Sequence, residues 1–466
     1  PARRAAVEAV ADSLTLSLAD GLAKERERFL ALKAGPESQA LRHIFFAERA
    51  ASKLPADLAD EADAVARIVQ TVAIIGAGTM GSGIAIACAN AGYSVVLIDQ
   101  SAEALERGLS TIDKSYARDV EKGRLTEAQA GERRDRIRGE RAFAAVSEAD
   151  IIVEAVFESL SVKTEVFREL DWHAKPGAVL ATNTSYLDVH AIAAATERRR
   201  NVLGLHFFSP AHIMKLLEVV RAERTSASAL ATGLDFGKRL GKIAVVAGVC
   251  HGFIGNRMLQ AYVREAGLML LEGAAPETID AALTGFGMPM GPFTTMDMAG
   301  LDIGYSMRQQ RDRESYEVKA FATLDKLVEM GRKGRKTGAG VYRYGDDGRT
   351  PEPDPETLTI AAETADEFNV KQQAPDTDEI VDRCILALIV EAGHILEDGI
   401  AERPGDIDVV YVNGYGFPRW RGGPLCYAGQ RGWPDVLARI DSFKDRFGPR
   451  WWTVAPAMHW LAGGEP

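Results

Sequence analysis

The segment TVAIIGAGTMGSGIAIACANAGYSVVLID, residues 71–99, decides the fold of this chain. An apolar run is followed by a glycine-rich loop, then by an apolar helical stretch and a second apolar run that ends at Asp99. This order predicts strand, tight turn, helix and strand, which is the context that a dinucleotide-binding loop requires. Glycines let the backbone approach a pyrophosphate, which the N–H groups at the helix N-terminus bind. We therefore predict a nucleotide site that includes Gly76, Gly78, Thr79, Met80 and Gly81.

Asp99 predicts which nucleotide this loop binds. A carboxylate at the end of the second strand accepts hydrogen bonds from the ribose hydroxyls and repels a 2′-phosphate. No arginine follows Asp99 immediately in the sequence. The sequence therefore favours NAD over NADP as the cofactor.

Composition and charge exclude several classes of protein. With 466 residues the chain is too long for one core, and roughly two to four domains are expected. Its charged fraction of 26% is that of a soluble globular protein, and its net charge of −11 argues against nucleic acid as a partner. The four cysteines have no CxxC spacing, so neither a zinc site nor a disulfide framework is indicated, and no metal ligand is assigned. The uncharged run 71–98 contains several glycines and changes its period, which favours buried strands and a helix over a membrane span.

Strand-like runs alternate with amphipathic segments over residues 71–250. This alternation predicts an α/β domain with a mainly parallel, doubly wound sheet of the Rossmann type. Residues 1–70 have helical periodicity and are expected to form a helical N-terminal segment. The expected strands are Thr71–Ile75, Ser94–Asp99, Ile151–Ala155, Ala178–Thr182, Val202–Phe207, Leu216–Val220 and Lys242–Val246.

Beyond residue 250 the sequence predicts helices in two related copies. Gly285-Phe-Gly-Met-Pro289 in the first copy is echoed by Gly414-Tyr-Gly-Phe-Pro418 in the second, at an offset of roughly 130 residues. This similarity indicates an internal duplication. We expect all-α domains at 251–350 and 379–466, joined by a linker at 351–378.

A second informative segment runs from Gly204 to Val219, where two apolar runs flank a bend at Ser209-Pro210. If the runs pair as strands, His206 and Glu218 face one another with their Cβ atoms about 5 Å apart. A carboxylate that holds one imidazole nitrogen leaves the other free to act as a base near neutral pH. Taken alone, the pair is explained equally well as a buried histidine whose hydrogen bond to a glutamate has a purely structural role.

Two further segments end expected strands and should line the crevice where the order of strands reverses. They are Glu154-Ala-Val-Phe-Glu158 and Thr182-Asn-Thr-Ser185. Charges at a helix N-terminus that favour the helix dipole are the structural alternative for the two glutamates, and for Glu154 this is the better explanation. Lys163 is equally well explained as a solvated helix residue.

These motifs taken together resemble the L-3-hydroxyacyl-CoA dehydrogenases of fatty-acid β-oxidation. The resemblance covers residues 71–345. The second helical copy and the leading segment are similar to the multifunctional, peroxisomal-type enzymes, in which an enoyl-CoA hydratase domain of the crotonase fold comes first. The resemblance implies that residues 1–70 are the tail of such a domain plus a connecting helix, with the hydratase site largely missing from this chain. The matching pieces are the Gly76 loop, Val153–Glu158, Asn183–Ser185, His206–Pro210 with Glu218, Gly252–Arg257 and Lys336–Tyr342.

The resemblance also implies roles for particular residues. His206 is the general base that takes the proton of the 3-hydroxyl group while hydride passes to the nicotinamide, and Glu218 is its partner. Ser185 and Asn256 lie near the reacting oxygen, and no metal is needed. Ser209 stands where many relatives have Asn, so its contact with cofactor or substrate is the least secure transfer. The remaining contacts implied are Glu158 and Lys163 with the cofactor, and Ser115 and Lys122 with coenzyme A.

The expected function is NAD-dependent oxidation of a (3S)-3-hydroxyacyl-CoA. The alternatives are another NAD-dependent 3-hydroxyacid dehydrogenase and a nucleotide-binding protein without turnover, such as a dehydrogenase-derived crystallin. The second helical copy favours a monomer over a dimer, because it can occupy the face through which dimeric relatives pair. No signal peptide and no peroxisomal C-terminal address are visible, so we expect a cytoplasmic protein, as in bacteria.

Overall fold

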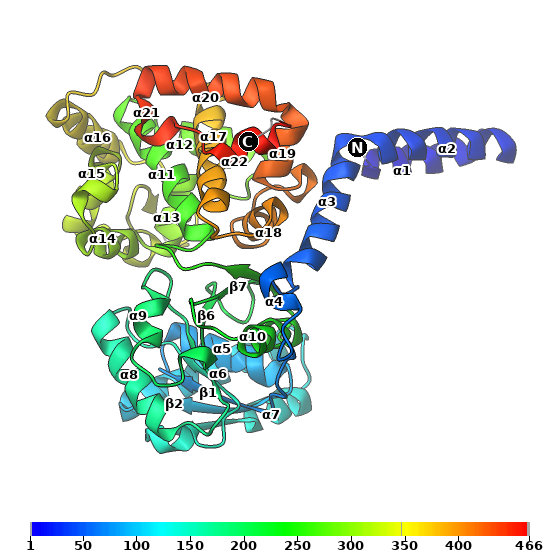
Figure 1. Cartoon of the computed structure of the whole chain (residues 1–466). Helices are drawn as coiled ribbons and strands as arrows, with labels where there is room; N and C mark the ends of the chain where they lie inside the picture. The colour runs from blue at the N-terminus through cyan, green and yellow to red at the C-terminus, as the bar shows by residue number, and fades with distance from the viewer. Residues whose placement is uncertain (1, 346, 464–466) are drawn as a thin grey trace. The chain divides into compact units, whose positions relative to one another are not determined.

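The computed structural model of the chain describes residues 2–345 and 347–463. These residues form two compact units, each of which combines segments that are distant in sequence (Figure 1). The sheet unit comprises residues 41–256 and 398–415. The helical unit comprises residues 2–40, 257–397 and 416–463.

The sheet unit is built on eight strands in the order β3-β2-β1-β4-β5-β6-β7-β8. All neighbours are parallel except β6 and β7, which are antiparallel. The order reverses at β1, between β2 and β4, which is where a doubly wound sheet binds its ligand. The strands are β1 (Thr71–Ile75), β2 (Ser94–Ile98), β3 (Ile137–Glu140), β4 (Ile151–Glu154), β5 (Val179–Thr182), β6 (Val202–Phe207), β7 (Leu216–Val220) and β8 (Ile243–Ala247).

Helices cover both faces of this sheet, with α8 and α9 on one face and α5, α6 and α10 on the other (Figure 1). The central strands are apolar at consecutive positions because both of their faces are buried; Val72, Ile74 and Leu97 have no exposed surface. The helices of this unit are α3 (Pro36–Ala51, in large part), α4 (Ala56–Ala59), α5 (Thr79–Asn90), α6 (Ala102–Glu121), α7 (Glu127–Asp135), α8 (Leu160–His173), α9 (Val189–Ala193), α10 (Ala227–Arg239) and α18 (Pro404–Gly414), with short 3-10 turns η1 (Phe143–Val146) and η2 (Arg199–Asn201).

The helical unit contains most of both halves of the predicted duplication, while residues 398–415 of the second half belong to the sheet unit. α13 and α19 are of equal length and both begin with proline, where the fixed φ of that residue suits the first helical turn. Its helices are α1 (Ala2–Ser13), α2 (Leu18–Ala34), α11 (Gly255–Leu271, which starts in the sheet unit), α12 (Pro276–Phe286), α13 (Pro292–Ala299), α14 (Leu301–Gln309), α15 (Val318–Glu329), α16 (Pro355–Glu367), α17 (Thr377–Glu397), α19 (Pro424–Arg431), α20 (Trp433–Phe447), α21 (Pro449–Trp452) and α22 (Pro456–Leu461). Three 3-10 turns, η3 (Arg313–Ser315), η4 (Arg335–Thr337) and η5 (Arg419–Arg421), and a two-stranded ribbon of β9 (Arg343–Tyr344) and β10 (Pro351–Glu352) complete the unit.

α11 and α17, which correspond to each other in the two copies, exchange ion pairs. Arg383 of α17 lies 3.0 Å from Glu265 of α11, and Arg257 of α11 lies 2.6 Å from Glu391 of α17. Each copy thus supplies the same arginine and the same glutamate to the other. Such reciprocal contacts are typical of a two-fold symmetric dimer interface, which here joins two parts of one chain.

The structure differs from the sequence analysis in two elements, β3 and α16. Strand β3 is missing from the expected strands, because only its first residue, Ile137, is a large apolar one. The segment expected as a linker, 351–378, contains helix α16, which packs on α15. The antiparallel pairing of β6 and β7 about the bend at Ser209-Pro210 agrees with the pairing considered in the sequence analysis.

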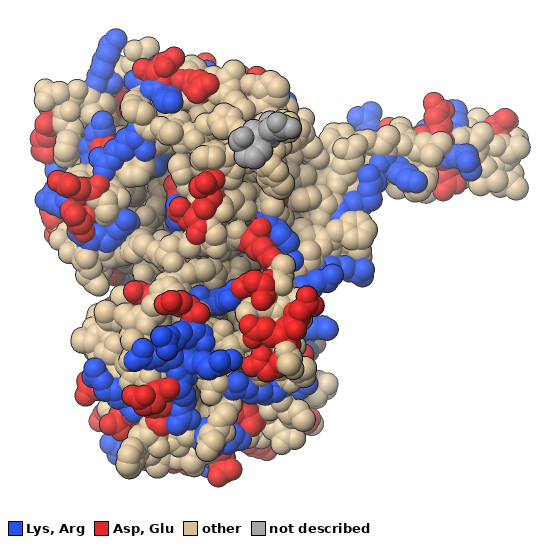
Figure 2. Space-filling model, viewed as in Figure 1, with Lys and Arg blue, Asp and Glu red and all other residues tan. Residues whose placement is uncertain are grey.

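No helix in the described residues is long and apolar enough to cross a membrane. The uncharged run 71–98 is divided among β1, α5 and β2, as expected. On the face shown in Figure 2, groups of basic side chains are interrupted by acidic ones rather than forming one continuous basic surface.

Candidate functional site

The antiparallel pairing of β6 and β7 brings His206 and Glu218 face to face. His206 Nδ1 lies 2.7 Å from Glu218 Oε2, and both side chains are almost completely buried. Because a carboxylate only accepts hydrogen bonds, Nδ1 carries the ring proton and Nε2 has the free lone pair. Nε2 has no hydrogen-bond partner among the described residues, so the ring is arranged as a base.

Glu218 is held by more than the histidine. Its other oxygen, Oε1, accepts hydrogen bonds from the backbone N–H groups of Ile254 at 3.1 Å and Gly255 at 3.0 Å. Gly255 is the first residue of α11, so the carboxylate also lies at the positive end of that helix. With both oxygens bonded, the carboxylate has one orientation and fixes the plane of the imidazole.

The turn that presents these N–H groups has an unusual backbone. Phe253 has a φ of +50°, in the left-handed region that few non-glycine residues adopt. Its ring packs on His206 with centroids 5.7 Å apart, and the ring of Phe208 packs on the same imidazole at 4.5 Å. Backbone strain of this kind persists only where the surroundings impose it, and here it accompanies two N–H groups aimed at Glu218.

The glycine loop between β1 and α5 is shaped by close backbone contacts. A Cβ atom on Gly81 would lie 1.8 Å from the carbonyl oxygen of Gly76, and Gly76 itself has a φ of +101°. A Cβ atom on Gly78, in contrast, would meet nothing within 4 Å. Gly76 and Gly81 therefore shape the turn, whereas Gly78 leaves open the approach to the N-terminus of α5, which no side chain caps.

The open space beside Gly78 is part of a cavity of about 740 Å³ in the sheet unit. Asp99, which directly follows β2, lines this cavity and accepts hydrogen bonds from the N–H groups of Ala77 at 2.9 Å and Ser101 at 3.0 Å. These bonds fix the carboxylate beside the loop. The lining includes Gly76, Gly78, Thr79, Met80, Asp99, Arg107, Val156 and Phe157.

Glu158 organises the loop that follows β5. Its Oε1 accepts hydrogen bonds from Thr184 Oγ1 at 2.5 Å and from the N–H of Ser185 at 2.8 Å. The neighbouring Asn183 accepts from the N–H of Phe207, at the end of β6, at 2.9 Å. Glu158 thus fixes the Ser185 loop, and Asn183 connects the same loop to the strand that carries His206.

Lys163 and Glu154 take places that the sequence analysis did not expect. Lys163 is fully buried and donates to Glu154 Oε1 at 2.7 Å, while its distance to Glu158 Oε2 is 3.4 Å. The interpretation of Glu154 as a helix N-terminal charge is wrong, because its side chain has no exposed surface and pairs with this lysine. The ammonium group of this buried lysine thus lies between the two glutamates and supports both of them.

The remaining predicted residues are more exposed. Asn256 is the second residue of α11, next to Gly255, and is partly exposed. Ser209 is exposed and follows Phe208 directly. Ser115 and Lys122 lie two turns apart on one face of α6, with Lys122 at its exposed end.

Several residues of the site were not found by sequence reasoning. Arg107 of α6 lines the same cavity as the glycine loop, but its position eight residues after Asp99 gives no signal in the sequence. The N–H groups of Ile254 and Gly255 carry no side-chain signal at all. Tyr415, from the end of α18, donates a hydrogen bond to Asn256 Oδ1 at 2.8 Å. The echo of Gly285–Pro289 at Gly414–Pro418 was the available signal for Tyr415, since tyrosine replaces phenylalanine there.

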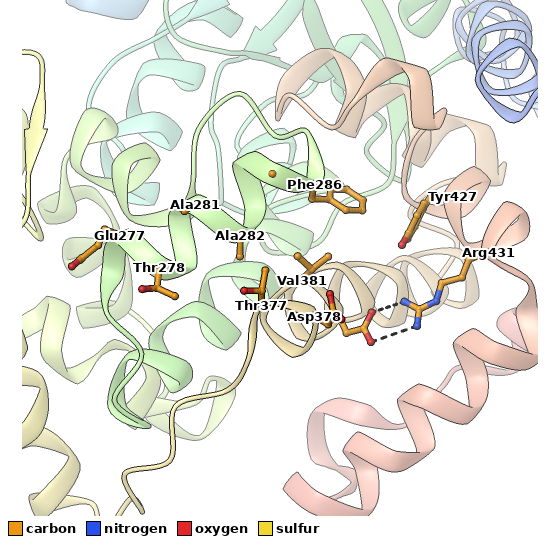
Figure 3. A pocket seen from close by; sticks show the side chains of 12 residues that line it. Glu277, Thr278, Ala281, Ala282, Phe286, Thr377, Asp378, Val381, Tyr427 and Arg431 are labelled. Atoms are coloured by element: carbon orange, nitrogen blue, oxygen red, sulfur yellow. Dashed lines mark hydrogen bonds and ion pairs between the residues drawn. The ribbon is translucent and has the colours of Figure 1, made fainter. Parts of the chain in front are cut away.

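Another cavity, of about 840 Å³, lies in the helical unit between α12 and α17 (Figure 3). It contains none of the predicted site residues, and its one arginine, Arg431, is paired with Asp382 at 2.5 Å. Glu277 and Asp378 add further negative charge to its lining. This cavity therefore has no free cation for a phosphate and differs in character from the glycine-loop cavity.

Comparison with protein families identifies two matching models. Residues 71–250 match the NAD binding domain of 3-hydroxyacyl-CoA dehydrogenase, and residues 252–344 match its C-terminal domain.

Curated relatives and solved structures agree with these matches. The peroxisomal bifunctional enzyme of Cavia porcellus is 40% identical over 453 residues, which are 94% of this chain but 62% of that protein. The chain therefore spans less than two thirds of the length of this relative. The structure of 3-hydroxybutyryl-CoA dehydrogenase from Escherichia coli is similar with a TM-score of 0.73 and 29% identity, covering 85% of this chain and 98% of that one. The (S)-3-hydroxybutyryl-CoA dehydrogenase from Ralstonia eutropha is 36% identical with a TM-score of 0.57, covering 60% of this chain and 100% of that one.

Proposed function

The chain belongs to the 3-hydroxyacyl-CoA dehydrogenase family, and from this premise we propose that it oxidises (3S)-3-hydroxyacyl-CoA to 3-ketoacyl-CoA with NAD. The observation that carries the proposal is the buried pair of His206 and Glu218, in which a carboxylate fixes the proton on Nδ1 and leaves Nε2 free. A fixed base is what removal of the 3-hydroxyl proton requires.

The residues of the glycine loop fit a dinucleotide. The space above Gly78 is open, and the uncapped N-terminus of α5 offers N–H groups to a pyrophosphate. Asp99 is fixed where it can accept hydrogen bonds from a ribose and repel a 2′-phosphate, which supports NAD rather than NADP. When bound, the nicotinamide ring supplies the acceptor for the hydride that leaves C3 of the substrate.

In the proposed reaction, His206 Nε2 takes the proton of the 3-hydroxyl group as the C3–H bond breaks. The ring then carries two protons and a positive charge, which the Glu218 carboxylate stabilises at 2.7 Å. General-base catalysis of this kind contributes about 10²–10⁴ to the rate. In the opposite direction the same imidazolium returns its proton to the ketone oxygen, so reduction is favoured as the pH falls.

We assign the contacts with the reacting oxygen to Asn256 and Ser185. Asn256 follows Gly255, the first residue of α11, whose N–H group donates to Glu218, and Ser185 belongs to the loop that Glu158 organises. A hydrogen-bond donor near the oxygen stabilises the negative charge that develops there. We further propose that Ser209, which follows Phe208, contacts the cofactor through its hydroxyl group, and that Ser115 and Lys122 contact coenzyme A.

Further proposals concern the whole protein. The reciprocal ion pairs of α11 and α17 support a monomer, because each copy covers the face that a second chain would use. α1 and α2 have no buried residue, and Leu14 and Leu18 are 84% and 80% exposed, which supports an additional domain that covers them in a longer protein. We propose that this domain is an enoyl-CoA hydratase, which would make the longer protein bifunctional.

The experiment that tests the activity follows NADH oxidation by the purified chain with acetoacetyl-CoA. Turnover should require the coenzyme A thioester, so acetoacetate at the same concentration is the matched control. NADH should be preferred to NADPH, and Asp99→Asn should reduce that preference. NADH binding without turnover of any 3-ketoacyl-CoA would instead favour a nucleotide-binding protein without catalysis.

A further inference from the structure

Tyr415 connects the second helical copy to the proposed active site. It follows directly on α18, whose helix packs on β7 and β8 within the sheet unit. Its hydroxyl group lies 2.8 Å from Asn256 Oδ1, although the two residues are far apart in sequence. A residue of the second copy thus contacts the side chain that we assign to the reacting oxygen.

The ring of Tyr415 is fixed on several sides. It stacks on Tyr411 with centroids 4.9 Å apart and meets Phe208 edge-on at 5.6 Å. It also lies against the backbone of Gly255, where a Cβ atom would come within 2.3 Å of the ring. These contacts leave the hydroxyl group little freedom, so its position at Asn256 is set by the fold.

The direction of the hydrogen bond follows from chemistry. Burial raises the pKa of Tyr415 well above its usual value, and the negative charge of Glu218 adds to this effect. The phenol therefore keeps its proton and donates it to Asn256 Oδ1. With Oδ1 bonded in this way, the Nδ2 end of the carboxamide, which carries two donors, is left to face away from Tyr415.

We propose that Tyr415 is a positioning residue for catalysis: it fixes the Asn256 carboxamide with its N–H donors directed to the reacting oxygen of the substrate. This inference rests on the proposed function. A preorganised donor stabilises developing charge because it does not reorient during the reaction. An Asn256 side chain without the hydroxyl partner rotates among several rotamers and presents its donor only part of the time. The second helical copy then completes the dehydrogenase site as well as packing against the first.

Comparison with the first copy shows which part of Tyr415 is specific to the second copy. Phe286 stands at the corresponding position and packs edge-on against Phe417 at 5.7 Å and Tyr427 at 5.2 Å. The guanidinium of Arg421 covers its face at 4.1 Å. Both copies therefore place an aromatic ring at the C-terminal end of the second helix of the repeat, but only the second copy adds a hydroxyl group, and that group is bonded to Asn256.

The test is Tyr415→Phe in the full chain, which converts the position to the residue of the first copy and removes only the hydroxyl group. We expect kcat with acetoacetyl-CoA to fall by about tenfold, a fraction of the 10²–10³ that loss of a whole donor costs. NADH affinity and the melting temperature should change little, because the ring contacts remain. Tyr427→Phe is the matched control, since it removes a tyrosine hydroxyl from a residue of the second copy that belongs to the helical unit and packs on Phe286, and it should leave kcat unchanged.

A double-mutant cycle shows whether Tyr415 acts through Asn256. In an Asn256→Ala background, Tyr415→Phe should have no further effect on kcat, because the group that it positions is gone. An equal loss in both backgrounds overturns the inference, as does an unchanged kcat in the single variant. A fall in NADH affinity and melting temperature parallel to kcat also overturns it in favour of a purely structural tyrosine. A wild-type chain that does not reduce acetoacetyl-CoA refutes the proposed function itself, and this inference with it.

Discussion

Replacing Glu218 by glutamine tests how the carboxylate controls its histidine. The carboxylate accepts three hydrogen bonds, from His206 Nδ1 at 2.7 Å and from the N–H groups of Ile254 and Gly255 at 3.1 and 3.0 Å. A glutamine has a single acceptor oxygen for these three donors. If its NH₂ group faced the two N–H groups, each would be left unsatisfied in a buried site, at a cost of about 1–3 kcal/mol.

The amide of the variant should therefore keep its oxygen on the two N–H groups and turn its NH₂ group toward His206. Nδ1 must then accept, which moves the ring proton to Nε2 and removes the lone pair that takes the substrate proton. We expect kcat to fall by about 10²–10⁴, the whole contribution of general-base catalysis. The affinity for NADH should change by less than about twofold, ~0.4 kcal/mol, since Glu218 makes no contact with the glycine loop.

The assay is steady-state NADH oxidation with acetoacetyl-CoA, combined with NADH binding measured by fluorescence. Glu265→Gln provides the control: this carboxylate is as buried as Glu218 but lies in the helical unit, so its loss should lower stability and leave kcat near wild type. A Glu218→Gln variant with wild-type kcat would refute the tautomer argument. A loss of NADH affinity larger than the loss of kcat would show that Glu218 is mainly structural.

Three further predictions test other parts of the structure. Gly78→Ala should keep the wild-type melting temperature and weaken NADH binding by about tenfold, ~1.4 kcal/mol. Gly81→Ala should also destabilise the fold by about 1–3 kcal/mol, because its Cβ atom would clash with the backbone. Equal melting temperatures of the two variants in calorimetry would contradict this difference. The hydrogen bond to the buried Asp408 raises the pKa of His43. The pair therefore stabilises the fold fully below the usual histidine pKa of about 6.5, and this stabilisation is lost as the pH rises through the raised pKa. The melting temperatures of wild type and His43→Gln should differ more in acid than in alkali, and the opposite trend would show that the pair does not stabilise the fold in this way. Arg383→Leu should cost about 3 kcal/mol in denaturant unfolding, because the carboxylates of Glu265 and Glu272 lose the positive charge that pairs with them. Arg257→Leu should cost less at its more exposed site, and equal losses would contradict the difference in burial.

Much of the fold could be predicted from the sequence because its signals are local. The apolar runs that form β1, β2 and β7 are buried on both faces, and such runs stand out in any chain. The facing of His206 and Glu218 was predictable as well, since strand pairing about a bend fixes the register of residues equally distant from it. β3 was missed because an edge strand with one large apolar residue has no such signal.

The candidate site was harder to predict where it depends on contacts between distant segments. The sequence analysis explained Glu154 as a helix N-terminal charge and left open a solvated position for Lys163, because burial of an ion pair depends on the tertiary fold and not on the local pattern. The backbone donors to Glu218 depend on the left-handed conformation of Phe253, a residue whose type gives no hint of it. Tyr415 reaches Asn256 only because α18 packs on the sheet, a contact that sequence periodicity does not specify.

The central claim is that His206 is the general base, and its most direct test is a single-turnover measurement of NADH oxidation by His206→Ala with acetoacetyl-CoA. The variant should bind NADH like the wild type, because the ring contacts Glu218 and two phenylalanines rather than the glycine loop. We predict that the chemical step slows by about 10²–10⁴. A folded variant that binds NADH and reduces acetoacetyl-CoA at the wild-type rate would contradict the account.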